Sequence, residues 1–270
     1  MKILVTNDDG LQAEGIAVLA SQLRGVGDVY VVAPASEQSG VGHGLTARNP
    51  LRAIQTPMPA ITEQAWAVTG TPADCVKLGI EQILGFLPDL VVSGINHGPN
   101  LATDTIYSGT VAGAMEGFLY GIPAIAISVV GSHRRLHRPG NFLLAAQVAV
   151  AYGVKLYESR ENMLLNINVP GSPEEGVKGI RFCPLGWRWY KDAFDKRVDP
   201  FGREYFWMQG VAEDRRIHGD TDVELCGEGY ITITPLRHDL TDYTALEKIS
   251  AEHLFSDVQF PEQQQQGPVE

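Results

Sequence analysis

Short runs of apolar, often β-branched residues alternate along the chain with amphipathic segments whose apolar positions recur at roughly helical spacing. The apolar runs predict strands at residues 3–5, 29–32, 90–92, 124–130, 163–169 and 230–234. The amphipathic segments predict helices at about residues 15–23, 73–84, 110–119, 142–156 and 243–255. Nearly continuous apolar strands separated by helices are typical of a parallel sheet that is covered on both faces. The pattern therefore predicts an α/β fold.

The alternation stops after Pro170, and residues 184–222 are rich in aromatic and charged side chains. The aromatic residues of this stretch are Trp187, Trp189, Tyr190, Tyr205, Phe206 and Trp207. We predict a projecting β-rich arm. Exposed aromatic side chains usually mark a contact surface, and a second copy of the chain is the expected partner. The alternative is an arm that folds back on its own core.

The 270 residues suit one large domain, which we place at residues 1–258 with the arm at about 184–222. Residues 259–270 include a glutamine run and predict a disordered polar tail. No apolar run reaches membrane-spanning length, and no basic segment followed by a long apolar one precedes the first strand, which favours a cytoplasmic protein without a membrane partner.

The formal net charge of −11 disfavours binding of a nucleic acid polymer. An acidic protein that acts on phosphates needs local positive charge, which a metal ion or a helix N-terminus can supply. The three cysteines are far apart in the sequence and contain no CxxC pair, so we expect buried, reduced thiols.

Two adjacent carboxylates, Asp8 and Asp9, come directly after the first strand and are followed by Gly10. Ligands of open α/β sheets bind at the carboxyl ends of strands, and a turn at this point lets both side chains converge. Oxygen ligands of this kind suit Mg²⁺, Mn²⁺ or Ca²⁺. The alternative is an ordinary Asn-Asp-Asp-Gly turn.

Two further loops follow strands at the same edge of the predicted sheet. After the second strand, Ser39 offers a hydroxyl, although an ordinary polar loop is the favoured explanation of this segment when it is taken alone. After the third strand, Asn96 offers an amide oxygen and Asn100 a side-chain NH₂ group. These residues extend the candidate metal and phosphate chemistry along one edge of the sheet.

Ser108, Gly109 and Thr110 open a predicted helix that is rich in small residues. Backbone N–H groups at a helix start, together with two hydroxyls, form an anion site, and Gly109 lets the backbone approach a phosphate. Ser108 can alternatively serve only as an N-cap.

Together these segments resemble the SurE survival-protein family, and the resemblance extends from residue 1 to about 245. The motifs that carry it are Asn7-Asp8-Asp9-Gly10, Ser39-Gly40, Gly70-Thr71-Pro72-Ala73-Asp74-Cys75-Val76, Ser93-Gly94-Ile95-Asn96 with Gly98 and Asn100, Tyr107-Ser108-Gly109-Thr110-Val111, Glu116-Gly117 and Ile233-Thr234-Pro235-Leu236. The resemblance implies a Rossmann-like core and a homodimer or homotetramer built by exchanged arms, with the C-terminal helix taking part in assembly.

The resemblance also implies a divalent-metal-dependent 5′/3′-nucleotidase that releases phosphate from nucleoside monophosphates, with exopolyphosphatase activity left open. It places one metal ion per subunit, Mg²⁺ or Mn²⁺, on Asp8, Asp9, Ser39 and Asn96. We assign catalysis to Asp8, Asp9 and Asn100. We assign phosphate binding to Asn100, Ser108, Gly109 and Thr110. The nucleophile is a metal-activated water or Asp9 itself.

The sequence departs from the family pattern at Ala102, where the family often has glycine, and this bears on the loop that follows Asn100. Residues 131–140 are more basic than expected and are either a solvated loop or an aid to anion binding.

Competing functions have less support. A haloacid-dehalogenase-type phosphatase would need Asp-x-Asp, whereas these acids are adjacent. The chain lacks a Gly-x-Gly-x-x-Gly run after a strand, which disfavours a dinucleotide oxidoreductase. A nucleotide-responsive binding protein without turnover is the remaining alternative.

Overall fold

The computed structural model describes residues 1–131, 139–171, 176–215 and 219–252. The chain divides into two compact units, Met1–Leu236 and Arg237–Glu270, and the second contains helix α6 (Tyr243–Glu252). The division falls before the end of the single domain predicted for residues 1–258, which stays a prediction. The predicted tail at residues 259–270 and most of the basic segment 131–140 lie outside the described residues.

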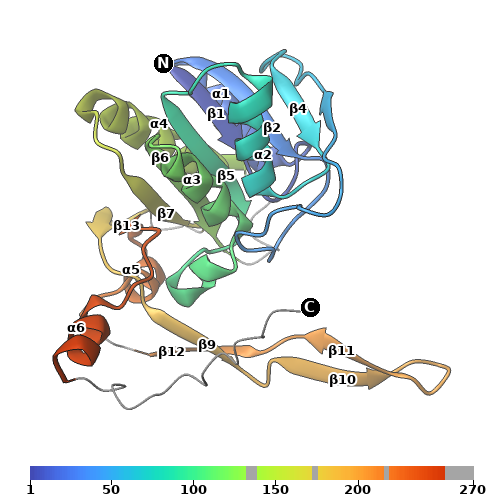
Figure 1. The fold of residues 1–270 in the computed structure, drawn as a ribbon, viewed down its shortest axis with the longest axis vertical. Coiled ribbons are helices and arrows are strands. Elements are labelled where there is room, and N and C mark those ends of the chain that lie inside the picture. Colours follow the sequence, from blue (N-terminus) through green and yellow to red (C-terminus); the bar gives the residue numbers. More distant parts are fainter. Residues whose placement is uncertain (132–138, 172–175, 216–218, 253–270) are drawn as a thin grey trace, which may run out of the picture. The chain divides into compact units, whose positions relative to one another are not determined.

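The first unit contains a nine-stranded sheet in the order β3-β4-β2-β1-β5-β6-β7-β13-β8 (Figure 1). Its strands are β1 (Lys2–Thr6), β2 (Asp28–Pro34), β3 (Ala53–Gln55), β4 (Ala65–Val68), β5 (Leu90–His97), β6 (Ala124–Val130), β7 (Leu164–Pro170), β8 (Ile180–Phe182) and β13 (Ile231–Leu236). The β3–β4 and β7–β13 pairs are antiparallel, and the other neighbours are parallel. The predicted mostly parallel α/β architecture is therefore confirmed.

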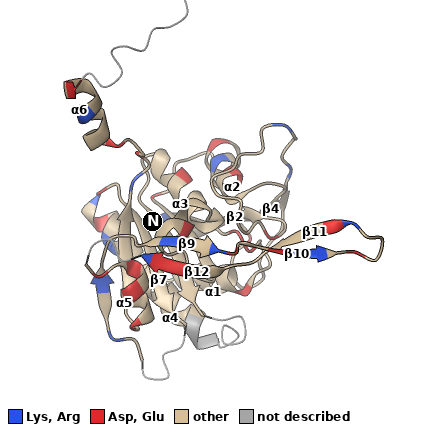
Figure 2. Ribbon diagram, turned by 90° about the horizontal axis from the view of Figure 1, so that it is seen from below, with Lys and Arg blue, Asp and Glu red and all other residues tan. Residues whose placement is uncertain are grey.

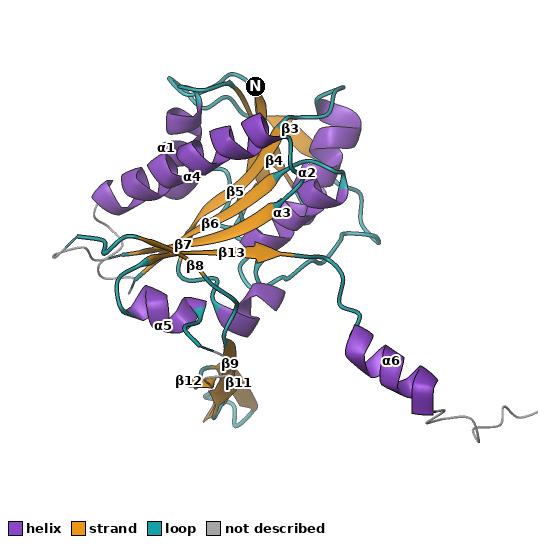
Figure 3. Ribbon diagram, turned by 90° about the vertical axis from the view of Figure 1, so that its left-hand side faces the viewer, coloured by secondary structure: helices purple, strands orange, loops and turns teal. Residues whose placement is uncertain are grey.

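Helices cover both faces of this sheet, as Figure 3 shows. Helices α1 (Glu14–Leu23) and α4 (Pro139–Ser159) pack on one face, and α2 (Pro72–Leu78) and α3 (Gly109–Leu119) pack on the other. Each face has its own cluster of buried apolar side chains. Because the strands contribute to both clusters, they must be apolar on both sides, which explains their continuous apolar runs.

The segment predicted as one helix over residues 73–84 changes geometry partway. Helix α2 ends at Leu78, and a π-helical turn, η1 (Gly79–Ile83), follows with a hydrogen bond of 2.9 Å from Leu84 N to Gly79 O. A π turn closes i→i+5 hydrogen bonds and so has more residues per turn than an α-helix. This change in period explains why the apolar residues of the segment match helical spacing only loosely.

Strand β1 lies at the point where the strand order of the sheet reverses. From β1 the chain proceeds to β2 on one side, whereas β5 pairs on the other side and leads to β6 and β7. In open α/β sheets, the carboxyl ends of the strands at such a switch point form the usual ligand site. The loops after β1 and β5 are therefore the expected location of the chemistry.

Strand β5 is irregular at its carboxyl end, where its register with β6 shifts between Gly94 and Asn96. Helix α1 passes close to this irregularity, and a Cβ atom on Gly15 would lie 2.1 Å from Ile95 O. Only glycine allows that approach. The α1 contact therefore constrains the backbone immediately before Asn96.

The predicted arm consists of two antiparallel pairs, one of β9 (Trp187–Lys191) with β12 (Val211–Arg215) and one of β10 (Phe194–Val198) with β11 (Glu204–Met208). Helix α5 (Asp222–Gly227) follows it. Aromatic side chains along the arm are exposed, including Trp187, Phe206 and Trp207. The alternative of an arm folded into its own core does not fit this exposure. Its role in assembly stays a prediction.

The described part of the chain also bears on the predictions for the cysteines and for membrane-spanning segments. Cys75, Cys183 and Cys226 are buried and free, as predicted. Within the described ranges, no helix has both the length and the apolar character needed to cross a membrane.

Gly15→Ala tests the contact between α1 and β5. The added methyl group would collide with backbone, so we expect a loss of about 1–3 kcal/mol in the free energy of unfolding. The control is Gly227→Ala in α5, where a Cβ would meet no atom within 4 Å and a helical alanine should be neutral or stabilising. Denaturant unfolding of both variants gives the comparison. Equal stabilities would show that the β5 end tolerates displacement.

Candidate active site

Asp8 lies at the carboxyl end of β1 and is held by the first turn of α3. Its Oδ1 accepts a hydrogen bond of 2.6 Å from Thr110 Oγ1, and the Thr110 backbone also hydrogen-bonds to the carboxyl group. Asp8 is only 4% exposed. The positive end of the helix dipole and the two donors favour a carboxylate at this position.

Burial nevertheless dominates the electrostatics of Asp8. Desolvation raises its pKa from the ordinary 3.8 to about 6, the hydrogen bond from Thr110 opposes this shift, and the neighbouring charge of Asp9 adds to it. Desolvation also raises the pKa of Asp9, and the negative charge of Glu37 raises it further. Neither Asp8 nor Asp9 forms an ion pair with a residue in the described ranges.

The structure brings the loop containing Ser39 to this carboxylate pair. Gln38 N donates to Asp8 O at 2.7 Å, which fixes the residue before Ser39 against the end of β1. Ser39 itself is exposed, and its hydroxyl donates to Glu37 at 2.9 Å. Glu37 is therefore a third acidic group at this edge, which sequence reasoning missed because nothing in the local pattern distinguishes it from a solvated side chain.

Asn96 reaches the same edge from β5. His97 N donates to Asp9 Oδ2 at 3.3 Å, which joins the end of β5 to Asp9. The Asn96 side-chain NH₂ donates to Gly98 O at 3.0 Å. This bond fixes the amide plane through its nitrogen, which leaves the amide oxygen as the group that can ligate a cation.

The side-chain oxygens of Asp8, Asp9, Ser39 and Asn96 fit a hard divalent cation. Two crowded carboxylates, at least one of them deeply buried, are energetically costly as anions unless positive charge compensates them. Carboxylate, hydroxyl and amide oxygens are the ligands that such cations prefer. Among the described residues, no three His, Cys, Asp or Glu side chains form a cluster suited to a metal ion, so a site here depends on the neutral oxygens of Ser39 and Asn96.

Asn100 occupies a buried polar network at the ends of β6 and β7. Its side-chain NH₂ donates to Ser128 Oγ at 2.8 Å, and its backbone N–H donates to Asn168 Oδ1 at 2.9 Å. Its carbonyl oxygen accepts from the side chains of Asn166 and Asn168. One of the two amide hydrogens of Asn100 is therefore already used within the protein.

Sequence reasoning missed Ser128, Asn166 and Asn168, although a signal was present. Asn166 and Asn168 are two residues apart in an otherwise apolar strand, so both point to the same face of the sheet. Polar side chains on a buried strand need partners. Here their partner is the backbone of the loop that carries Asn100.

The start of α3 has a different set of contacts from the predicted one. Ser108 Oγ accepts from Val111 N at 3.0 Å, so Ser108 is the N-cap of the helix. A Cβ on Gly109 would lie 2.8 Å from Asp8 Cβ and 3.2 Å from Pro72 Cγ. Gly109 thus allows the helix start to approach Asp8 closely. Phosphate binding by Ser108, Gly109 and Thr110 stays a prediction.

A network of charged and polar groups holds the loop that follows Ser39. His43 contacts Glu116 of α3 at 2.8 Å, and Glu116 also pairs with Lys77 at 3.3 Å. Thr46 N donates to Asp74, which is the N3 residue of the α2 capping box. Asp74 and Glu116 belong to sequence motifs that had no assigned role. Their contacts show that they anchor the Ser39 loop on α2 and α3.

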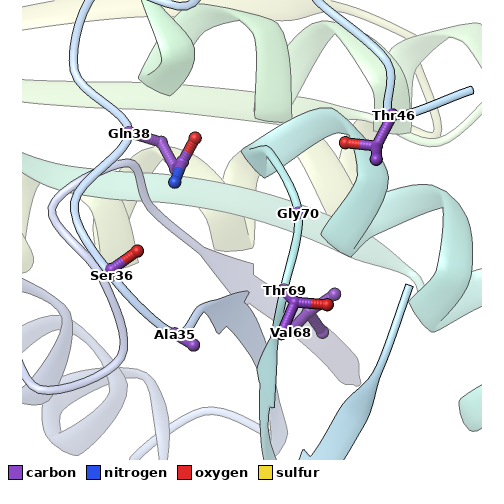
Figure 4. A pocket seen from close by; sticks show the side chains of 7 residues that line it. All are labelled: Ala35, Ser36, Gln38, Thr46, Val68, Thr69 and Gly70. Atoms are coloured by element: carbon purple, nitrogen blue, oxygen red, sulfur yellow. The ribbon is translucent and has the colours of Figure 1, made fainter. Parts of the chain in front are cut away.

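A pocket of about 270 Å³ lies beside the same loop (Figure 4). The side chains of Ser36 and Gln38 line it from the β2 end, and Thr46 and Thr69 line it from the opposite side. Because Gln38 also bonds to Asp8, the pocket borders the carboxylate site. Its lining combines the apolar side chains of Ala35 and Val68 with hydroxyl and amide groups, which suits a sugar or a heterocycle with hydrogen-bonding groups.

Comparisons with known proteins show which family the chain resembles. A family model described as "Survival protein SurE" matches residues 3–192. Proteins named 5′-nucleotidase SurE are similar over nearly the full length. One from Pelotomaculum thermopropionicum is 48% identical, and the match covers 92% of this chain and 94% of that protein. One from Heliobacterium modesticaldum is 44% identical, and the match covers 93% of this chain and 91% of that protein. The crystal structure of a SurE protein from Aquifex aeolicus superposes with a TM-score of 0.77 at 40% identity, covering 94% of this chain and all of that one.

The pKa of Asp8 predicts how stability depends on pH when no divalent cation is bound. Because folding raises this pKa from 3.8 to about 6, the folded state binds the proton more tightly than the unfolded state does. Protonated Asp8 therefore makes its full contribution to the free energy of unfolding below about pH 4. This contribution, on the order of 3 kcal/mol, is lost as the pH rises to about 6.

Denaturant unfolding in a chelator at pH 4 and pH 6.5 measures this change. Asp8→Asn removes the titrating group, so the difference between the two pH values should shrink by the contribution of Asp8. Added Mn²⁺ should restore the stability of the original protein at the higher pH, because it compensates the ionised carboxylate. An identical pH dependence in both proteins would contradict the assignment.

Proposed function

The chain belongs to the SurE survival-protein family, and from this premise we propose that it is a divalent-metal-dependent 5′-nucleotidase that hydrolyses nucleoside monophosphates to nucleoside and phosphate. The observation that carries the proposal is the pair Asp8 and Asp9 at the β1 switch point, crowded, desolvated and without a protein cation among the described residues. A binding protein without turnover is not favoured, since the similar proteins are named as enzymes.

We assign one divalent cation to the oxygens of Asp8, Asp9, Ser39 and Asn96. When bound, such an ion neutralises phosphoryl charge and makes a water molecule more acidic. Thr110 orients Asp8 through its hydroxyl. Asp9 is less buried than Asp8 and has a raised pKa, so it suits the role of accepting a proton from the attacking water.

The phosphoryl group carries about two negative charges at neutral pH and needs donors in addition to a cation. We assign this role to the second amide hydrogen of Asn100 and to the start of α3 at Ser108, Gly109 and Thr110. The network around Asn100 keeps its amide in one orientation, so little reorganisation accompanies charge development. We place the nucleoside in the neighbouring pocket between Gln38 and Thr69.

Several finer features stay predictions. These are Mg²⁺ or Mn²⁺ as the resident ion, activity toward 3′-nucleotides, exopolyphosphatase activity and a cytoplasmic location. None of them changes the chemistry assigned to the two carboxylates.

Phosphate release from AMP tests the activity directly. Chelation should abolish turnover, and Mg²⁺ or Mn²⁺ should restore it. Asp9→Asn should lower kcat by about 10²–10⁴-fold, because the variant loses both a ligand and a proton acceptor. The matched control is Asp89→Asn: Asp89 bonds to Lys2 N at the opposite end of β1, so its loss should leave kcat nearly unchanged. Full turnover of AMP without divalent metal would falsify the proposal.

We further propose that the arm joins copies of the chain into a dimer or tetramer. Phe194 and Met208 are directly paired across β10 and β11, and both are largely exposed. By the same register, Phe206 lies on their face of the hairpin, so the three side chains form an apolar surface.

Sedimentation velocity tests this surface. Phe206→Asp should shift the protein to a smaller species, because burial of a charge at a subunit contact is costly. Leu87→Asp, at an exposed apolar residue outside the arm, should leave the sedimentation coefficient unchanged. If both variants sediment like the original protein, this face of the arm is not the contact between subunits.

A further inference from the structure

The segment between Asn100 and Ser108 contains the 3₁₀ turn η2 (Ala102–Ile106), and residues at the root of the arm hold it. This segment joins the two groups of proposed phosphate ligands, so its shape determines the distance between them. Ala102 at its start has φ +53°, in the left-handed region that favours glycine. A residue other than glycine is strained in this region, so contacts from outside must maintain the turn.

Asp222 provides the first of these contacts. It is fully buried at the start of α5, its Oδ2 accepts from Ala102 N at 2.8 Å, and its Oδ1 accepts from Gly186 N at 2.7 Å. One carboxylate therefore ties the start of the turn to the residue that precedes β9. A buried carboxylate with two backbone donors is a rigid connection.

Arg188 of β9 provides the second contact. Its Nη1 donates to Asp104 of the turn at 3.1 Å, and its Nε and Nη2 donate to the two oxygens of Asp214 on β12 at 2.7 and 3.0 Å. The side chain is 12% exposed. Figure 2 shows the same arrangement of charge, with basic residues on β9 beside acidic ones on β12. A single guanidinium therefore links both strands of the arm root to the turn.

Three further hydrogen bonds reach the segment from outside, and one lies within the turn. Tyr190 donates its hydroxyl to Asp104 at 2.9 Å, and the Thr103 hydroxyl donates to the carbonyl oxygen of Arg188. From the other side, Gly42 N donates to Tyr107 O at 2.9 Å. Within the turn, Thr105 donates to Ala102 O. Among the described residues, most hydrogen bonds and ion pairs that reach the turn from outside thus come from the arm root or from α5.

We propose that Arg188 is a positioning residue for the phosphate site: by linking Asp104 to Asp214, it holds the η2 turn in the shape that keeps Asn100 and the start of α3 at the separation needed to bind a phosphoryl group. Asp222 fixes the other end of the same turn. This inference rests on the proposed nucleotidase function. Its consequence is that the placement of the arm affects phosphate affinity without any arm residue touching the substrate.

The charges around Arg188 explain why its replacement should displace the η2 turn. Asp104 is 16% exposed, and Asp214 shares the same guanidinium with it. Without that cation, the largely shielded carboxylate of Asp104 and the more exposed carboxylate of Asp214 lose their shared partner, and their repulsion favours separation of the turn from the arm root. Replacing Asp104 by a neutral residue in the same protein should remove that repulsion. The second substitution should therefore restore part of the phosphate affinity that the loss of Arg188 removes.

The experiment compares Arg188→Gln, Arg188→Lys, Asp104→Asn and the double variant R188Q/D104N, with Lys155→Gln as the control. Lys155 forms an exposed ion pair with Glu158 on α4, so the control removes one positive charge at a place remote from the η2 turn. The measurements are KM for AMP, the Kd of inorganic phosphate by calorimetry in the presence of Mn²⁺, the Mn²⁺ concentration for half-maximal activity, and the sedimentation coefficient.

Arg188→Gln should weaken phosphate binding and raise KM by about 3- to 30-fold, the range expected when a connecting network is broken. The Mn²⁺ midpoint should change by less than about twofold, because the assigned metal ligands do not contact Arg188. Arg188→Lys should recover part of the affinity, since lysine keeps the charge but not the fork geometry. The double variant should bind phosphate more tightly than R188Q alone.

Unchanged phosphate affinity in Arg188→Gln with a native sedimentation coefficient would overturn the inference. So would an equal loss of metal and phosphate affinity, because that would indicate general damage to the fold. If the original protein released no phosphate from AMP, the proposed function would fail instead. Calorimetry with phosphate needs no turnover, so it still tests the η2 connection in that case.

Discussion

The contact between Asp8 and the first turn of α3 is the interaction on which the rest of the site depends. Thr110 donates to a carboxylate that burial alone would keep protonated near pH 6, and Gly109 gives the helix room to approach it. The contact joins β1 to α3 and sets where charge is concentrated. The loops carrying Ser39 and Asn96 are positioned relative to this point through Gln38 and His97.

Around this contact the protein has two kinds of polar group. On the carboxylate side, Asp8, Asp9 and Glu37 crowd negative charge, which a cation must offset. On the amide side, Asn100, Ser128 and the two strand asparagines hydrogen-bond to one another, and among the described residues only Asn166 Oδ1 of this group is buried without a partner. The first group is electrostatically unbalanced and suited to ligand binding. The second is uncharged and bonds Asn100 through its backbone N–H, its carbonyl oxygen and its side chain, so it can hold Asn100 in one orientation.

The arm root connects this chemistry to a distant surface. Arg188 and Asp222 hold the turn between Asn100 and Ser108, and the same residues fix the start of β9 and of α5. An arm with exposed aromatic side chains and a loop beside the assigned phosphate site therefore share one set of charged residues, of which Asp222 is fully buried. Such sharing couples sites because packed polar networks do not deform gradually.

The sequence by itself determined the parallel core, the arm, and the candidate residues Asp8, Asp9, Ser39, Asn96 and Asn100, because apolar periodicity and polar residues after strands are local signals. Only the tertiary structure decided which partners each residue meets: Gly109 packs against Asp8, Asn100 binds Ser128, and Arg188 reaches Asp104 across 84 positions of the chain. The physical reason is that hydrogen bonds and ion pairs between distant segments depend on chain packing, which leaves no periodic trace in either segment.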